Sequence, residues 1–397
     1  MHESKRIFGL RKNVFFLGLV SLFNDFSAEM VYALMPAFLT SVLGAPPVFL
    51  GFMEGFVDAF ASILKIVSGW LSDKIGKRKS LAVVGYALAV STRSILAFVT
   101  NFWQVFALRV VDRAGKGLRD SPRDALISES VEASEVGKSF GYHRAMDTVG
   151  AILGPLSAVI LLPLVSGNYR TMFLIAFGVG IFAVLSFLFV KEAKKSEDII
   201  PKAPVPFTFS LKNFDRSFKL LLVAVFIFGV GVMPVSLVLL KVKDIGLAFE
   251  SIPLMYLIYT VTFALTAIPF GRLSDKVGEK EVIIGGFLAA IVAYVILSQA
   301  QSILWVVLGF VTFGLYSAMT DGIERALTSK LVSHEQIATG QGFLQSAIGI
   351  SSLVGGLIGG SIWTYFGSSP AFIYGVIMMA VGLLAFVRLN GYKPESK

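Results

Sequence analysis

The chain alternates long apolar runs with short polar segments along all of its 397 residues. Each run is close to 20 residues long, which is the length that an α-helix needs to cross a hydrocarbon core about 30 Å thick. The pattern therefore predicts twelve membrane-spanning helices. They cover approximately residues 14–40, 47–71, 80–100, 102–122, 141–164, 170–190, 219–241, 251–272, 281–299, 302–325, 338–363 and 369–389.

The segment 191–218 interrupts this pattern in the middle of the chain. It is charged and contains three prolines, so it predicts a surface linker rather than a helix in the membrane. We therefore expect three parts: an N-terminal six-helix bundle over 1–190, a cytoplasmic linker over 191–218 and a C-terminal six-helix bundle over 219–397. The predicted fold class is an all-α membrane protein of two pseudo-symmetric bundles.

A short polar motif occurs twice at a separation of about half the chain. Residues 69–79 read GWLSDKIGKRK, and residues 271–281 read GRLSDKVGEKE, 202 residues further on. Asp120 and Asp321 continue the correspondence at an offset of 201 residues. Such a repeat indicates a duplicated unit. Parallel repeats of six helices place a substrate path at their interface, near the middle of the bilayer.

Composition supports the membrane assignment and excludes several other classes. Hydrophobic residues make up 55% of the chain and charged residues 15%, against roughly 25% charged residues in soluble domains. The absence of cysteine excludes disulfides and thiol catalysis. With three histidines and no phosphate-binding or hydrolase motif, we predict no catalytic residue, no metal site and no cofactor. The first apolar run contains acids, so we expect a transmembrane helix rather than a cleavable signal peptide.

The net charge of +9 is distributed as a topology signal. Lys and Arg gather before the first run, after even-numbered runs, in the linker and at the C-terminus, whereas the alternate connections hold few. The positive-inside rule then predicts that both termini are cytoplasmic. We expect the lipid bilayer and a small-molecule substrate as partners, no nucleic acid, a monomer, and the inner membrane of a prokaryote as the location.

The repeated motif also carries a resemblance to a known family. Gly-x-Leu-Ser-Asp-Lys-x-Gly-Lys-Arg-Lys after the second run, with a weaker copy after the eighth, resembles the loop signature of the major facilitator superfamily. Together with the twelve runs, it covers the whole chain. The resemblance implies a secondary transporter that works by alternating access, with protons as the coupling ion.

Several charged residues fall within the apolar runs of the first half. An ionised group at the bilayer centre costs at least about 2.5–3.5 kcal/mol, so these residues must pair or face a wet cavity. Within the pairs Asp25 with Glu29 and Glu54 with Asp58, four residues separate the acids, so each pair shares one helix face. A proton relay and static ion pairing are both compatible with this pattern. The residues predicted for proton coupling are Asp25, Glu29, Glu54, Asp58, Arg93, Arg109 and Arg113.

Two further motifs resemble helix signatures of the same superfamily. Residues 109–117, RVVDRAGKG, resemble its fourth-helix motif, which implies a proton-transfer role for Arg109, with Arg113 as the alternative. The spacing of Gly141, Gly150 and Gly154-Pro155 resembles the fifth-helix signature of its antiporters, although Ala158-Val159 replaces the final glycine pair. The resemblance implies export, while ordinary helix packing also produces such spacing.

Charged residues at the predicted cytoplasmic ends form a candidate latch. Acids after the fourth run could pair with Lys77 or Arg78, although a solvated loop is an alternative. The second copy carries Glu279 and Glu281 where the first carries Lys77 and Lys79, so the first copy is expected to be the stronger latch. The predicted latch residues are Gly69, Asp73, Gly76, Lys77, Arg78, Asp120, Arg123, Asp124, Asp275, Asp321, Glu324 and Arg325.

The second half carries few charges within its runs but many aromatic residues. This asymmetry predicts proton handling in the first half and a substrate cavity between the halves. The predicted cavity residues are Asn24, Tyr256, Tyr259, Phe263, Tyr316, Gln341 and Gln345. The favoured function is proton-coupled efflux of an amphipathic solute. The alternatives are proton-coupled import of a small organic or metal-chelate solute and a receptor that does not transport.

Overall fold

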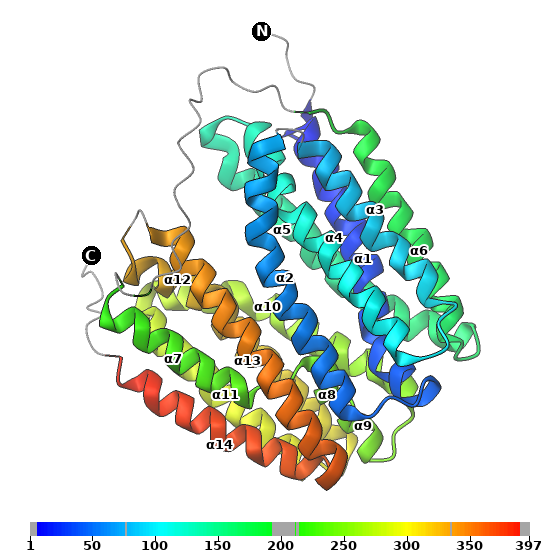
Figure 1. The fold of residues 1–397 in the computed structure, drawn as a ribbon, viewed down its shortest axis with the longest axis vertical. Coiled ribbons are helices and arrows are strands. Elements are labelled where there is room, and N and C mark those ends of the chain that lie inside the picture. The colour runs from blue at the N-terminus through cyan, green and yellow to red at the C-terminus, as the bar shows by residue number, and fades with distance from the viewer. Residues whose placement is uncertain (1–5, 76–77, 193–210, 212–213, 334–335, 390–397) are drawn as a thin grey trace.

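The computed structural model describes residues 6–75, 78–192, 211, 214–333 and 336–389, and of residues 62, 63, 65–75, 133 and 338 it describes the backbone alone. Almost all of this chain is helical (Figure 1). Two short antiparallel strands, β1 (Arg6–Ile7) and β2 (Leu10–Arg11), precede the first helix. Phe8 and Gly9 close their turn with positive φ angles of 48° and 75°.

Twelve long helices occupy the twelve predicted runs within the described residues. In the first half they are α1 (Lys12–Ala37), α2 (Pro47–Ile75), α3 (Arg78–Leu96), α4 (Phe102–Glu129), α5 (Val136–Leu164) and α6 (Tyr169–Ser186). In the second half they are α7 (Arg216–Gly231), α10 (Ile252–Val277), α11 (Glu279–Gln299), α12 (Ile303–Leu331), α13 (Ile337–Phe366) and α14 (Ser368–Val387). By length and composition, nine of the described helices could cross a membrane: α1, α5, α6, α7 and α10–α14.

Short helical segments connect the long ones. A π-helix, η1 (Phe38–Val42), extends α1, and α7 is followed by α8 (Val235–Val238) and α9 (Lys241–Asp244). Three 3₁₀ turns complete the described helices: η2 (Ala133–Glu135), η3 (Phe187–Phe189) and η5 (Phe249–Ser251).

The helix pairing repeats between the halves. In the first bundle α1 packs on α5 and α6, α3 packs on α4 and α6, and α2 packs on α4. In the second bundle α7 packs on α13 and α14, α11 packs on α12 and α14, and α10 packs on α12. Between the bundles, α2 packs on α13 and α5 packs on α10 (Figure 1). Each contact thus has a counterpart in the other half, which is the arrangement that a duplicated unit produces.

Glycines bring the two bundles together near one end. A Cβ on Gly51 of α2 would collide with the Gly356 carbonyl of α13, and a Cβ on Gly360 would lie 2.8 Å from Val48 Cα. The Val48 amide donates a hydrogen bond to Thr364 Oγ1 at 3.0 Å. Small residues permit this close approach of two helix backbones. We call this the closed end, and we call the opposite end, where α2, α4 and α10 finish, the basic end.

Two helices extend beyond their predicted ends. The predicted fourth run ends at residue 122, but α4 continues through Pro122 to Glu129, so the solvated charged loop considered for this stretch is wrong. Arg123 contacts Asp120 at 3.7 Å, one turn earlier, which favours helix through the charged stretch. Likewise, α12 continues six residues past the predicted end at 325, to Leu331. Polar side chains therefore mark where the apolar run ends, not where the helix ends.

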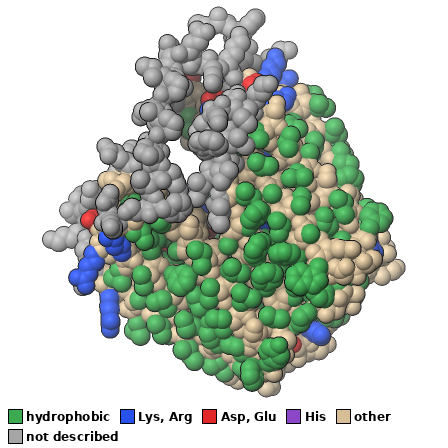
Figure 2. Space-filling model, in the orientation of Figure 1, with side chains coloured by type: hydrophobic (Ala, Val, Ile, Leu, Met, Phe, Trp, Pro, Cys, Tyr) green, Lys and Arg blue, Asp and Glu red, His purple; other side chains and the backbone are tan. Residues whose placement is uncertain are grey.

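The outer surface of the bundles is apolar. Leu164, Leu188 and Leu265 are each at least two-thirds exposed. Figure 2 shows hydrophobic side chains over most of the visible face, with Lys and Arg mainly near its edges. A surface of this kind is stable against lipid rather than water. The protein is therefore integral to a membrane.

Candidate functional site

Charged side chains of α1 to α4 meet inside the first bundle, as the sequence predicts. We call Asp25, Glu29, Glu54, Arg93, Arg109, Asp112 and Arg119 the central charge cluster. Of these, Glu54, Arg93, Arg109 and Arg119 are buried, and the others are partly buried. Buried charges must be paired or hydrogen-bonded to be tolerated, and the contacts below show how the cluster achieves this.

Glu54 and Arg109 form the most deeply buried ion pair of the cluster. The Arg109 Nη2 atom donates hydrogen bonds to both carboxylate oxygens of Glu54, at 3.1 and 2.9 Å. Arg109 Nη1 also lies 3.7 Å from a carboxylate oxygen of Asp112, and its guanidinium lies 5.6 Å from the centre of the Tyr32 ring. Arg109 therefore has a second acceptor within reach should Glu54 become protonated.

Asn24 joins two arginines that come from different helices. Its Oδ1 atom accepts hydrogen bonds from Arg93 Nη2 at 2.8 Å and from Arg119 Nη1 at 3.3 Å. Its Nδ2 atom donates to Asp25 Oδ1 at 2.9 Å. Asn24 is 1% exposed, so it lies within the first bundle rather than on the predicted substrate cavity. The reason is that two guanidinium groups occupy its single carbonyl oxygen.

Glu29 connects the cluster to the other bundle. Its Oε2 atom accepts a hydrogen bond from the Tyr256 hydroxyl of α10 at 2.6 Å. The Tyr256 ring lies 5.1 Å from the Tyr32 ring and 6.0 Å from the Tyr259 ring, measured between centroids. An acid predicted to handle protons thus contacts the second half directly.

A cleft of about 440 Å³ lies between the bundles. Predicted cavity residues Tyr259, Phe263 and Tyr316 line it, and Tyr256 stacks against Tyr259 at its edge. Asp58, predicted for proton coupling, is exposed and also lines this cleft. The remaining lining residues are Val225, Phe228, Gly229, Ser317, Thr320, Asp321, Glu324, Ile348 and Ser351.

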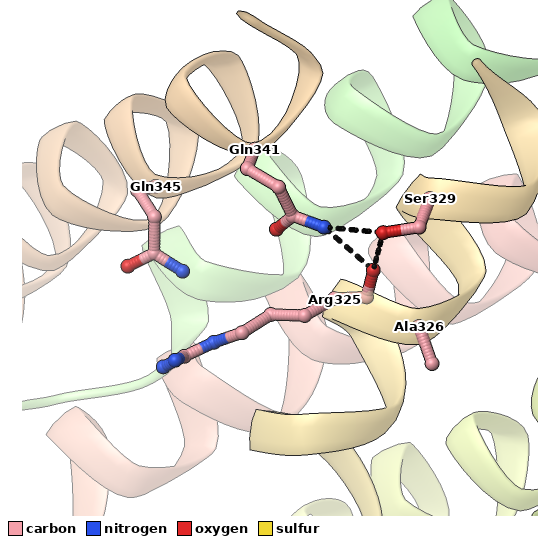
Figure 3. Close-up of a pocket in the computed structure, with 5 residues that line it drawn as sticks. All are labelled: Arg325, Ala326, Ser329, Gln341 and Gln345. Carbon is pink, nitrogen blue, oxygen red and sulfur yellow. Dashed lines mark hydrogen bonds between the residues drawn. The ribbon is translucent and has the colours of Figure 1, made fainter. Parts of the chain in front are cut away.

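Gln341 and Gln345 line a different pocket, between α12 and α13 (Figure 3). The Gln341 amide donates hydrogen bonds to the Arg325 carbonyl at 2.7 Å and to Ser329 Oγ at 3.0 Å. The structure therefore differs from the expectation that both glutamines face the central cavity. The longer α12 accounts for this, because its last turns present a carbonyl and a hydroxyl to Gln341.

The predicted antiporter-like helix packs tightly on α1. A Cβ on Gly150 would lie 2.5 Å from the Leu22 carbonyl oxygen, and a Cβ on Gly154 would lie 2.6 Å from Glu29 Cβ. Pro155 is buried beside them, whereas Gly141 is exposed with open space around its Cα. Gly150 and Gly154 therefore hold α5 against the helix that carries Asp25 and Glu29.

The predicted latch lies partly outside the described residues. Gly76 and Lys77 lie outside them, and for Gly69 and Asp73 only the α2 backbone is described. Arg78 is paired with Glu129 at 2.5 Å.

The acids predicted as latch partners pair with Arg123 instead. Asp120 lies 3.7 Å from Arg123, and Asp124 lies 2.8 Å from it. The extended α4 explains the difference, because it carries Glu129 to the start of α3. The predicted Asp120 or Asp124 contact with Arg78 is thus replaced by one with Glu129.

The second half repeats this contact with its charges reversed. Glu279 at the start of α11 pairs with Lys330 near the end of α12 at 2.5 Å. Glu279 and Lys330 are the counterparts of Arg78 and Glu129, each 201 residues further along. Among the second-half latch residues, Asp275 is exposed near the end of α10, and Arg325 pairs with Asp321 at 2.7 Å. Glu324 is buried and lines the cleft.

Four residues of the site were not predicted for it. Asp112 contacts Arg109, and Arg119 bonds Asn24 while lying 4.4 Å from the Tyr86 ring centre. Ser21 donates a hydrogen bond to Asp147, whose carboxylate lies 3.5 Å from His143 Nδ1. The three-residue spacing from Arg109 to Asp112 was a usable signal. The partners of Arg119 and Asp147 come from other helices, so no local pattern identifies them.

The remaining predicted residue of this group, Arg113, is partly buried on α4, and its Nε atom has no hydrogen-bond partner in the described structure. Among the described residues, no group of three or more His, Asp or Glu side chains is arranged to hold a metal ion. The arrangement can exchange protons between carboxyl groups and accommodate a small organic molecule.

Comparison with known proteins identifies the family. A sequence profile of the Major Facilitator Superfamily matches residues 17–248 and 220–397. An uncharacterized MFS-type transporter of Methanocaldococcus jannaschii is 31% identical over 388 residues, which cover 95% of each chain.

More distant proteins agree with this match. The multi-drug resistance efflux pump PmrA of Streptococcus pneumoniae is 25% identical over 359 residues, covering 87% of this chain and 88% of the pump. The crystal structure of the nucleoside transporter NupG superposes with a TM-score of 0.80 at 14% identity, covering 95% of this chain and all of the other, which shows a shared fold. The chain therefore belongs to the Major Facilitator Superfamily and is a membrane transporter rather than an enzyme.

Proposed function

We propose that the protein is a proton-coupled antiporter that exports a small amphipathic solute across the inner membrane of a prokaryotic cell, acting as a monomer with protons as its coupling ion. The observation that carries the proposal is the hydrogen bond between Glu29 and Tyr256. It joins an acid of the central charge cluster to the opposite bundle, near the closed end.

This contact gives a direct link between protonation and conformation. A carboxylate accepts a hydrogen bond more strongly than a neutral carboxyl does. Ionised Glu29 therefore holds Tyr256 and stabilises the contact between α1 and α10. Protonation weakens the contact, so that the free energy of separating the bundles at this end depends on the protonation of Glu29.

The rest of the cluster supports proton transfer near Glu29. Asp25 lies one turn before Glu29 on α1. Arg109 lies between Glu54 and Asp112 and can move between the two carboxylates, at distances of 2.9 and 3.7 Å in this conformation. A shift of Arg109 toward Asp112 leaves Glu54 free to take a proton. Acids and arginines arranged in this way can pass protons through the first bundle.

The direction of transport is supported by α5 and by a relative. Gly150 and Gly154 make the tight α1–α5 contact that the antiporter-like spacing predicts. The pneumococcal relative is named a multi-drug resistance efflux pump. Apolar and aromatic residues in the cleft suit an amphipathic solute.

Transport in proteoliposomes with an imposed pH gradient tests the proposal. We expect solutes that are transported to release protons in the opposite direction, measured with a pH-sensitive dye on the far side of the membrane. Glu29→Gln is expected to abolish this coupled proton flux, and Tyr256→Phe to reduce it. Protons that move in the same direction as the solute, or solute movement without protons, would contradict antiport.

A further inference from the structure

Glu324 of α12 is a buried carboxyl group that the proton relay does not use. It is 6% exposed and lines the cleft between the bundles. Within the described part of the chain, its carboxylate accepts no hydrogen bond and forms no ion pair. The neighbouring Arg325 is paired with Asp321 at 2.7 Å, and its side chain extends toward Gln345 in the other pocket (Figure 3).

The acids of the first bundle show how unusual this is. Glu54 is neutralised by Arg109, and Glu29 is hydrogen-bonded by Tyr256. Asp25 accepts a hydrogen bond from Asn24. A carboxylate that is buried without such a partner is costly, so it must either take a proton or receive a cationic group from outside the chain.

The surroundings of Glu324 favour an organic cation. Phe228, Tyr259, Phe263 and Tyr316 line the same cleft, and the Phe228 and Tyr316 ring centroids lie 5.9 Å apart. The faces of such rings attract organic cations and also bury apolar groups. Asp58 and Asp321, which also line the cleft, increase its negative potential.

The size and chemistry of the cleft agree with this occupant. Its volume of about 440 Å³ lies in the usual range of about 300–1,000 Å³ for sites that bind small organic molecules. The carboxylates in it are not arranged as a metal site among the described residues. A cation that enters the cleft must therefore bring its own apolar groups.

We propose that Glu324 binds the positive charge of an amphipathic organic cation, whose apolar part lies against Tyr259, Tyr316 and Phe228. The inference rests on the proposed transport function and names the substrate class of its cleft. Glu324 is then a binding residue of the second bundle, separate from the acids that handle protons in the first.

Equilibrium binding to the full-length protein in lipid nanodiscs tests the proposal, with tetraphenylphosphonium as the cationic probe and triphenylphosphine oxide as a neutral probe of similar shape. We expect Glu324→Gln to weaken binding of the cation by about 30-fold or more and to leave binding of the neutral probe unchanged. Asp275→Asn is the matched control, because it removes an exposed acid outside the cleft, and it should change neither affinity.

A second measurement keeps the test independent of the variant's folding. In the unaltered protein, tetraphenylphosphonium should protect Glu324 from modification by a hydrophobic carbodiimide, detected by mass spectrometry of the labelled peptide. The neutral probe should protect it less. Failure of the unaltered protein to bind the cation, equal loss of both probes in Glu324→Gln, or absence of selective protection would overturn the inference.

The outcomes also separate this inference from the proposed antiport. Cation binding through Glu324 without any coupled proton flux would sink the antiport and leave the binding site standing. Coupled antiport of a neutral or anionic solute that continues in Glu324→Gln would do the reverse.

Discussion

Glu54 and Arg109 allow a static ion pair to be distinguished from a working one. Loss of Glu54 alone, in Glu54→Gln, leaves a buried guanidinium uncompensated and should destabilise the fold by about 3–5 kcal/mol. Replacement of both residues by Met removes both charges at similar volume and should restore much of that stability. Because a proton relay needs the charges, we expect the double variant to remain inactive in transport. Thermal unfolding and proteoliposome flux measure the two effects.

The result decides between the two interpretations that the sequence left open. A double variant that is stable and transports at the original rate would show that the pair only holds helices together. Tyr32→Phe is a suitable control, because it keeps the aromatic ring that Arg109 faces at 5.6 Å and removes only the hydroxyl.

At the scale of single residues, the sequence predicts which groups must be paired but not with which partner. The cost of burying charge singles out Glu54, Arg93 and Arg109, and the structure places all three inside the first bundle. That Asn24 is shared by Arg93 and Arg119 depends on how α1, α3 and α4 face one another. No spacing along a single helix contains that information.

The contact between α1 and α5 gives a prediction for whole elements. A methyl group on Gly154 would lie 2.6 Å from Glu29 Cβ, so Gly154→Ala must push the helices apart. We expect it to lower the free energy of unfolding by about 1–3 kcal/mol and to reduce transport by displacing Glu29.

Gly141 on the same helix supplies the matched control. It has open space around its Cα, so Gly141→Ala should gain about 0.5–1 kcal/mol from helix propensity alone. Equal effects of the two substitutions on stability, measured by denaturation in detergent, would contradict a specific role for the α1–α5 contact.

Helix positions were predictable because lipid imposes a length and a polarity on each run, and all twelve runs became helices. The ends of α4 and α12 were not, because helices continue into the aqueous phase, where composition no longer restricts them. The contact of α2 with α13 through Gly51 and Gly356 was missed as well. Its only local signal was the spacing of Gly51 from Gly55 and of Gly356 from Gly360, four residues in each case.

Across the whole molecule, the duplicated unit explains more than the loop motif by which it was recognised. The pairs Arg78–Glu129 and Glu279–Lys330 occupy equivalent positions with opposite charges. What each half has retained is therefore the attachment of its third long helix to its fourth, rather than particular residues. In this conformation these pairs lie within one half, whereas the contacts that join the halves lie at the closed end.

This arrangement predicts which end must open during transport. Val48 and Thr364 are in contact at the closed end, 3.0 Å apart between amide nitrogen and hydroxyl oxygen. Because the chain has no cysteine, Val48→Cys with Thr364→Cys can be joined selectively by a short bifunctional thiol reagent. Alternating access requires α2 and α13 to separate here, so we expect cross-linking to abolish transport and cleavage of the linker to restore it. Each single-cysteine variant, treated in the same way, should stay active. Undiminished transport by the cross-linked protein would mean that substrate leaves by a route that does not separate these helices.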